Sequence, residues 1–113
     1  IPAPTADFGL LRTAVETAEA MGVTADVGSV YCSDFFYHPD KTVNQKAKDM
    51  GLLAVEMETA GLYLSAMANH KKALSILTIS DHIFNGEFLT PEEIREGFHE
   101  MMEIALKTAI TAA

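Results

Sequence analysis

The chain has 113 residues, which is enough for one domain with a modest hydrophobic core. A composition of 49% hydrophobic and 21% charged residues argues against disorder, and a formal net charge of −8 argues against nucleic acids and anionic membranes as partners. No apolar run approaches the ~20 residues that a membrane span needs, no signal peptide is visible, and a single cysteine, Cys32, suits a reducing cytoplasm.

The first quarter of the chain predicts a helix followed by a strand. The chain begins at Ile1 rather than at a methionine, which suggests a fragment or a processed chain. Apolar residues at helical spacing indicate a helix that starts after a cap at Thr5 or Asp7 and ends before Gly22. Residues 23–31 have the pattern of a strand, in which Gly28 marks a bulge or a close approach of another segment.

An aromatic loop follows this strand at residues 32–40. Three consecutive aromatic residues, Phe35, Phe36 and Tyr37, are hard to bury together, because adjacent side chains on an extended backbone face opposite ways. At least one ring is therefore a candidate for contact with a ligand, and the alternative is that all three fasten the loop to the core. A short polar helix is expected over residues 42–50, with its lysines in solvent and Gly51 at its end.

Acidic residues follow two predicted strands at the point where each strand ends. Residues 52–55 are continuously apolar, as in a strand buried on both faces, and lead through Glu56 and Glu58 into a helix that reaches about residue 70. A second apolar strand over residues 73–79 ends at Ser80 and Asp81. Ligand sites of α/β sheets lie at the carboxyl ends of strands, so three carboxylates are expected at one edge. For either motif taken singly, a helix cap or a solvated side chain is the better explanation. The pair of motifs at matched positions is what favours a site.

The last quarter predicts a turn and a long helix. Asn85 and Gly86 signal a turn, and the run from Thr90 to Glu93 has the pattern of a capped helix start. The helix carries an apolar stripe that must pack on the sheet, formed by Ile94, Phe98, Met101, Met102, Ala105 and Ile110. Alternating helices and strands predict an α/β fold with a parallel or mixed sheet in three layers.

The motifs of this chain resemble those of the nucleoside phosphorylase superfamily, most closely purine nucleoside phosphorylases of the bacterial hexameric type. The resemblance is carried by Val55-Glu56-Met57-Glu58 with Ala60-Gly61, by Ser80-Asp81-His82-Ile83, and by Phe35-Phe36-Tyr37 with Pro39-Asp40. It runs from about Asp7 to the C-terminus and covers the second half of a family member. The resemblance implies an incomplete three-layer phosphorylase-like fold with a mixed sheet, in which residues 1–113 are the C-terminal portion of one domain.

The implied activity is a pentosyl transfer, the reversible phosphorolysis of purine (deoxy)ribonucleosides to free base and (deoxy)ribose 1-phosphate. Asp81 would be the general acid that protonates the purine, and such an acid needs a raised pKa, which burial or nearby carboxylates can supply. By the same resemblance Phe36 stacks on the base and Glu58 holds the ribose hydroxyls. The remaining substrate-binding residues would be Val55, Glu56, Met57 and Ser80.

Two departures from the family pattern limit the expectation. The family's phosphate-binding residues are expected outside this chain, so phosphate would be a co-substrate and the isolated chain is expected to be inactive. The arginine that the family carries on its last helix is matched by Ile94, with Arg95 beside it. No metal or other cofactor is expected. The partners implied are a purine nucleoside, phosphate and further copies of the chain, as a hexamer.

Three alternatives stay open at this point. A hydrolytic nucleosidase of the same superfamily would use water instead of phosphate. A non-catalytic fragment would keep the fold and need a second polypeptide. The choice between 6-oxo and 6-amino purines is also left open by these residues.

Overall fold

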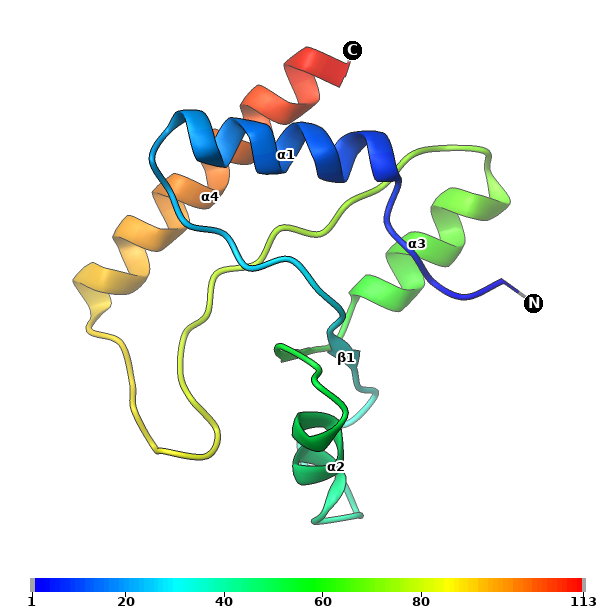
Figure 1. Cartoon of the computed structure of the whole chain (residues 1–113). Coiled ribbons are helices and arrows are strands. Elements are labelled where there is room, and N and C mark those ends of the chain that lie inside the picture. The colour runs from blue at the N-terminus through cyan, green and yellow to red at the C-terminus, as the bar shows by residue number, and fades with distance from the viewer. Residues whose placement is uncertain (1, 113) are drawn as a thin grey trace. The chain divides into compact units, whose positions relative to one another are not determined.

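The computed structural model describes residues 2–112, which divide into two compact units (Figure 1). The strand-pair unit consists of residues 2–5 and 26–73, and the helix-pair unit consists of residues 6–25 and 74–112. The described residues form four helices and two short strands. None of these helices is both long enough and apolar enough to cross a lipid bilayer.

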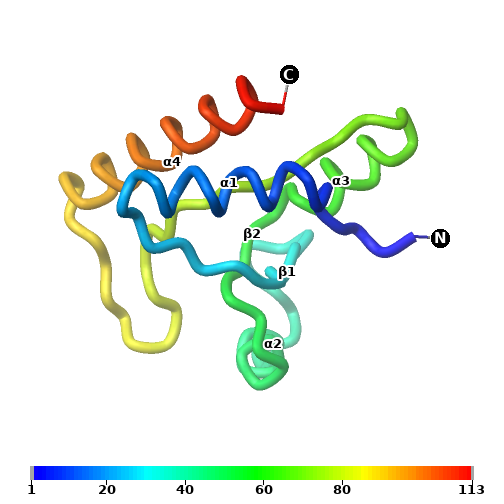
Figure 2. Tube along the Cα trace, turned by 45° about the horizontal axis from the view of Figure 1, so that its top comes forward, coloured from blue at the N-terminus to red at the C-terminus, as the bar shows by residue number. Residues whose placement is uncertain are grey.

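The strand-pair unit is built on two parallel strands, β1 (Tyr31–Cys32) and β2 (Val55–Glu56), which lie side by side in Figure 2. Backbone hydrogen bonds extend the pairing beyond the named strands, from Leu53 N to Ser29 O at 2.9 Å and from Ser33 N to Glu56 O at 2.8 Å. The helices of this unit are α2 (Val43–Asp49) and α3 (Thr59–Ala68). Strands joined by helices confirm an α/β chain with a small parallel sheet.

The predicted strand over residues 23–31 is wrong in extent, because only its last residues, from Ser29 to Tyr31, take part in the pairing. The expectation of a strand buried on both faces is also wrong. Residues 52–56 alternate instead, with Leu53 and Val55 exposed and Glu56 half-buried. The prediction at Gly28 is confirmed, since a Cβ atom there would lie 2.8 Å from Leu53 Cδ1.

The helix-pair unit contains α1 (Phe8–Ala20) and α4 (Pro91–Ala112), which pack against each other (Figure 1). Asp7 caps α1 by accepting a hydrogen bond from Leu10 N at 2.9 Å, which decides the cap in favour of Asp7. A reciprocal pair starts α4, in which Glu93 N donates to Thr90 Oγ1 at 3.1 Å and Thr90 N donates to Glu93 Oε1 at 3.3 Å. Both predicted helix starts are confirmed.

The core of the helix-pair unit is small. Ala14 and Ala18 of α1 and Ile104 of α4 form its buried cluster, against which Met21, Val23, Leu74 and Ile76 pack. The face of α4 that turns inward carries Ile104 and Thr108, both buried, one turn apart. Most of the predicted stripe is therefore on the wrong face. Its members Ile94, Phe98, Met102 and Ile110 are exposed, whereas the face with Ile104 and Thr108 meets the core.

The predicted strand over residues 73–79 is absent from the described structure, in which this segment pairs with no strand. It lies along α4 instead. Thr78 Oγ1 is 3.2 Å from Gly97 O, and a Cβ atom at Gly97 would lie 3.0 Å from the Thr78 methyl group. An apolar run predicts burial, and only a paired neighbour turns such a run into a strand.

Candidate functional site

The turn between β2 and α3 carries both glutamates of the predicted site, and they have different surroundings. Glu56 is half-buried, and its Oε2 accepts hydrogen bonds from the backbone N of Glu58 and of Thr59, each at 2.8 Å. Burial acts to raise the pKa of Glu56, but these N–H donors outweigh it and hold the pKa below its usual range. Glu58 is exposed at the N-cap position of α3, and its side chain makes no capping hydrogen bond.

Val55 and Met57 lie on the opposite, open side of this strand end. Val55 is 38% exposed and Met57 is 41% exposed, so both apolar side chains are accessible to a ligand. The strand period of two puts them on one face and Glu56 on the other. Met57, which the resemblance implies as a substrate-binding residue, is therefore not part of the buried core.

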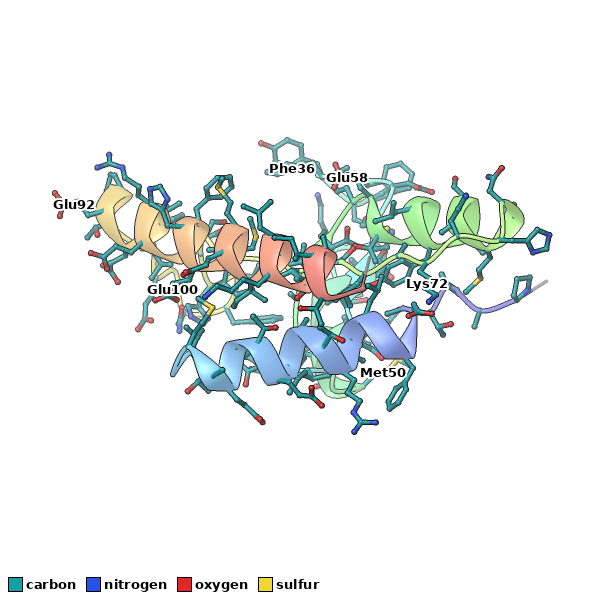
Figure 3. All side chains as sticks on the ribbon, turned by 90° about the horizontal axis from the view of Figure 1, so that it is seen from above. Phe36, Met50, Glu58, Lys72, Glu92 and Glu100 are labelled. Atoms are coloured by element: carbon teal, nitrogen blue, oxygen red, sulfur yellow. The ribbon has the colours of Figure 1, made fainter. Side chains whose placement is uncertain are left out.

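The aromatic loop presents its rings to solvent. Phe36 is 78% exposed and Tyr37 is 83% exposed, with ring centroids 4.9 Å apart in an edge-to-face pair. The alternative that all three rings fasten the loop to the core is therefore wrong. Figure 3 shows Phe36 and Glu58 projecting to the same side of the strand-pair unit. A flat heterocycle stacked on Phe36 and a diol bound by Glu58 would thus meet this unit from one side.

Hydrogen bonds at both ends hold the aromatic loop. At its start, buried Ser33 donates from Oγ to Phe35 O at 2.9 Å, and Phe35 N donates back to Ser33 Oγ at 3.1 Å. Phe35 also packs edge-to-face on His38, with ring centroids 5.1 Å apart. The loop that carries Phe36 is thus fixed by its own short-range contacts.

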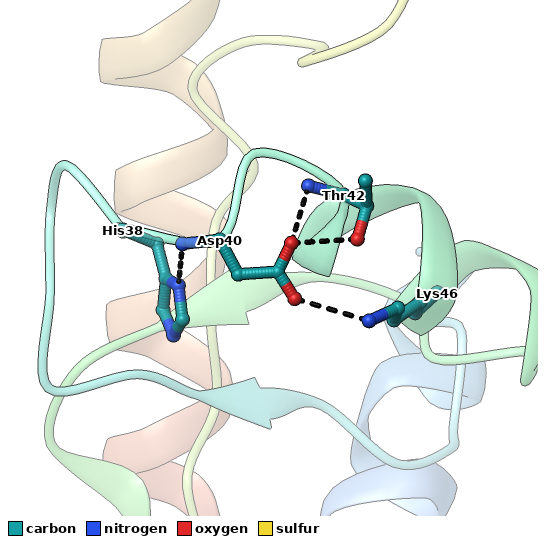
Figure 4. Close-up of polar contacts among 4 residues, drawn as sticks. All are labelled: His38, Asp40, Thr42 and Lys46. Atoms are coloured by element: carbon teal, nitrogen blue, oxygen red, sulfur yellow. Dashed lines mark hydrogen bonds and ion pairs between the residues drawn. The ribbon is translucent and has the colours of Figure 1, made fainter.

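A cluster around Asp40 holds the other end of the loop (Figure 4). Asp40 Oδ1 accepts from Thr42 Oγ1 at 2.6 Å and from Thr42 N at 2.9 Å, while Oδ2 pairs with Lys46 Nζ at 3.0 Å. The Thr42 hydroxyl and amide, with the Lys46 ammonium, hold the pKa of Asp40 well below its usual range. Asp40 N donates to His38 Nδ1 at 2.9 Å. Sequence reasoning missed this cluster, although Asp40 two residues before Thr42 is the signature of an Asx turn.

The remaining predicted site residues, Ser80 and Asp81, belong to the helix-pair unit. Both are exposed, and Ser80 Oγ donates to Asp81 Oδ1 at 2.8 Å. Asp81 forms an isolated antiparallel bridge with Phe88, and His82 N donates to Glu87 O at 2.8 Å. The two residues therefore begin a hairpin-like loop around the predicted turn at Gly86, which has a φ of 67°. The sequence had predicted that Ser80 and Asp81 follow a strand of the sheet, and this prediction is wrong for the described residues.

The predicted residues are thus gathered as two sets. Phe36, Val55, Glu56, Met57 and Glu58 lie in the strand-pair unit, and Ser80 and Asp81 lie in the helix-pair unit. Within residues 2–112, no group of three or more His, Cys, Asp or Glu side chains is arranged to hold a metal ion. The first set provides hydrogen-bond acceptors and solvent-exposed apolar side chains.

The parallel strands and the helices that follow them define an α/β protein. A carboxylate and an exposed ring beside the strand end form a candidate site for a small polar ligand. The chain belongs to the phosphorylase superfamily, whose sequence model matches residues 1–112.

Relatives of this chain are named as purine nucleoside phosphorylases of the DeoD type. A type 2 protein from Vibrio vulnificus (strain YJ016) is 47% identical over 105 residues, which are 93% of this chain and 44% of that protein. The protein from Myxococcus xanthus is 50% identical over 107 residues, 95% of this chain and 45% of that protein. The protein from Geobacillus stearothermophilus is 50% identical over 108 residues, 96% of this chain and 46% of that protein. These relatives confirm the resemblance, and the chain spans less than half of their length.

Proposed function

We propose that this chain supplies the base and ribose site of a purine nucleoside phosphorylase, which converts purine (deoxy)ribonucleosides and phosphate to free base and (deoxy)ribose 1-phosphate. The observation that carries the proposal is the match of nearly the whole chain to relatives named for this activity. The open ring of Phe36 and the uncommitted carboxylate of Glu58 support it, because they offer the two surfaces that a nucleoside needs.

In the proposed reaction a phosphate oxygen forms a bond to the sugar carbon as the bond from that carbon to the purine nitrogen breaks. The bonding electrons leave with the base, so the leaving purine carries negative charge. Asp81 gives its proton to the base as general acid, with Ser80 beside it. Glu58 accepts hydrogen bonds from the ribose hydroxyls, because an ionised carboxylate is an acceptor only.

Apolar contacts complete the proposed site. Phe36 stacks on the purine, while Val55 and Met57 line the open side of the strand end, under the base and the sugar. Glu56 belongs to the same turn between β2 and α3. The proposed reaction needs no cofactor, because phosphate is a substrate.

The phosphate site is proposed to lie outside these 113 residues, because the seven glycines form no phosphate-cradle motif. We propose that both units are parts of one domain with a three-layer fold, that copies of the protein form a homo-oligomer, a hexamer by resemblance, and that it works in the cytoplasm, where the free Cys32 stays reduced. The 113 residues alone are proposed to be inactive.

A chimera tests this function. This chain replaces the matched 46% of the Geobacillus stearothermophilus relative, and release of base from inosine and adenosine is measured with and without phosphate. Phosphate-dependent turnover is expected from the chimera and none from the 113 residues alone. Asp81→Asn should lower kcat about 10²- to 10⁴-fold, and Glu58→Ala should lower kcat/KM about 10- to 100-fold.

The other outcomes favour the rival functions. Turnover that is independent of phosphate would reject phosphorolysis in favour of a hydrolytic nucleosidase. A folded chimera that is inert towards both nucleosides would reject both enzyme proposals and leave a non-catalytic chain that needs a different polypeptide.

A further inference from the structure

The start of α3 is capped by side chains from the two strand ends rather than by its own N-cap residue. The first N–H groups of a helix have no partner within the helix. Here Glu56 Oε2 accepts from the N of Glu58 and of Thr59, and Cys32 Sγ accepts from Ala60 N at 3.4 Å. Cys32 and Glu56 are direct partners in the parallel register. Two adjacent side chains on one face of the strand pair therefore satisfy three successive N–H groups.

We propose that Glu56 and Cys32 are positioning residues that take over the capping of α3 and so leave the carboxylate of Glu58 free for the ligand. An acid at a helix N-terminus ordinarily turns to the free N–H groups, which attract negative charge. Glu58 makes no such bond, although it occupies the N-cap position. Ala60 N, one of the two amides that an N-cap side chain ordinarily reaches, already donates to Cys32, and the two amides before it already donate to Glu56.

The carboxylate of Glu56 is turned towards the protein. Its Oε1 is shielded from solvent and has no hydrogen-bond partner among the described residues, while Oε2 is occupied by the two amides. A carboxylate with one oxygen shielded from solvent and the other held by two amides is poorly placed to bind ribose. Glu56 thus acts on the ligand through Glu58.

The Cys32 thiol is linked to the same carboxylate. The Ala60 N–H lowers the pKa of Cys32, but burial and the hydrogen bond and charge of Glu56 outweigh it, so the pKa is raised. Cys32 is therefore a neutral thiol at pH 7, and its sulfur accepts from Ala60 N. The ionisation of Cys32 reports the charge at position 56.

Hydrogen exchange of the 113-residue chain, measured by NMR at the amides of Glu58 and Thr59, tests the capping. Glu56→Ala should speed exchange at both amides about five- to tenfold, the effect of losing a helix cap. Glu56→Gln keeps an acceptor oxygen and should restore most of the protection. Glu58→Ala is the matched control and should leave Thr59 exchange unchanged. Equal protection in the parent and in Glu56→Ala, or equal loss in Glu58→Ala, would overturn the proposal.

The rate of Cys32 alkylation by iodoacetamide as a function of pH is a second measurement, and the helix content separates its result from a general loss of structure. Glu56→Gln removes the charge and keeps the shape, so the alkylation profile should move to lower pH while the helix content by circular dichroism stays the same. An unmoved profile would contradict the contact between Cys32 and Glu56. In urea, where both chains are unfolded, the parent and Glu56→Gln should be alkylated at the same rate.

Naming the ligand rests on the proposed function, and the experiment separates the two. Inosine added to the chimera should bind more weakly with Glu56→Ala and recover with Glu56→Gln. If Glu56→Ala loses the cap but the unsubstituted chimera does not bind inosine, the proposed function is rejected and the capping role is retained. Normal inosine binding by an uncapped Glu56→Ala would sink the positioning role.

Discussion

The two glutamates of the β2–α3 turn show how neighbouring residues of one type divide their tasks. Glu56 and Glu58 are two positions apart, yet one is half-buried under backbone donors and the other is exposed without a capping bond. The difference comes from the strand period, which turns Glu56 to the covered face just before the helix begins. The sequence does not distinguish the two acids, and only the backbone geometry shows that one is hydrogen-bonded and the other exposed.

Because the native pKa of Glu56 is held below its ordinary value of 4.5, this residue makes stability depend on pH. As pH falls through about 4.5 the unfolded chain takes up a proton at Glu56 before the folded chain does, so the stabilisation is present above that pH and is lost below it. Urea unfolding of the parent and of Glu56→Gln between pH 3 and 6 measures this. The difference in unfolding free energy should shrink as pH falls. A difference that stays constant over this range would contradict the assignment, and Glu58→Gln controls for the loss of one charge.

At the scale of elements, helices were predictable and strands were not. The signals for α1 and α4 are local, since Asp7 and Thr90 lie within three residues of the amides they cap. A strand depends on a partner far along the chain, and β1 and β2 keep only the residues that pair. The face of α4 was mispredicted for a related reason, because hydrophobicity alone does not tell which stripe meets α1.

The reciprocal cap at the start of α4 should contribute to the stability of the helix-pair unit. Thr90→Ala removes the acceptor for Glu93 N and should lower the unfolding free energy by about 1 kcal/mol. Thr90→Ser keeps the hydroxyl and is the matched control, which should stay close to the parent. Urea titrations followed by circular dichroism at 222 nm measure both. Equal stability of the Ala and Ser variants would show that this cap contributes nothing.

For the molecule as a whole, the candidate site was predictable where one segment carries it. Val55 to Glu58 are contiguous, so their place at a strand end followed from the sequence pattern. The crowding of aromatics predicted only that at least one of three rings would be free, and the resemblance singled out Phe36. The contacts of Asp40 with Lys46 depend on side-chain reach and were missed. The pattern also failed at Asp81, where the expected strand is absent.

The exposed apolar surface makes self-association the expected behaviour of the isolated chain. Among residues 2–112 only four hydrophobic residues are buried, whereas Leu106 is 62% exposed and Ile110 is 75% exposed on α4. Apolar area left in water contributes nothing to stability and favours contact between copies. Sedimentation velocity at micromolar concentration should therefore show dimers or larger species.

Replacing Leu106 and Ile110 by serine together should shift that distribution towards monomer. The matched control is the double replacement of Glu96 and Glu100 by serine, which alters the same helix without removing apolar area and should leave association at least as strong, because it lowers the negative charge that keeps copies apart. A parent chain that sediments as a single monomeric species and unfolds cooperatively would contradict this expectation, since it would show that the small buried core suffices.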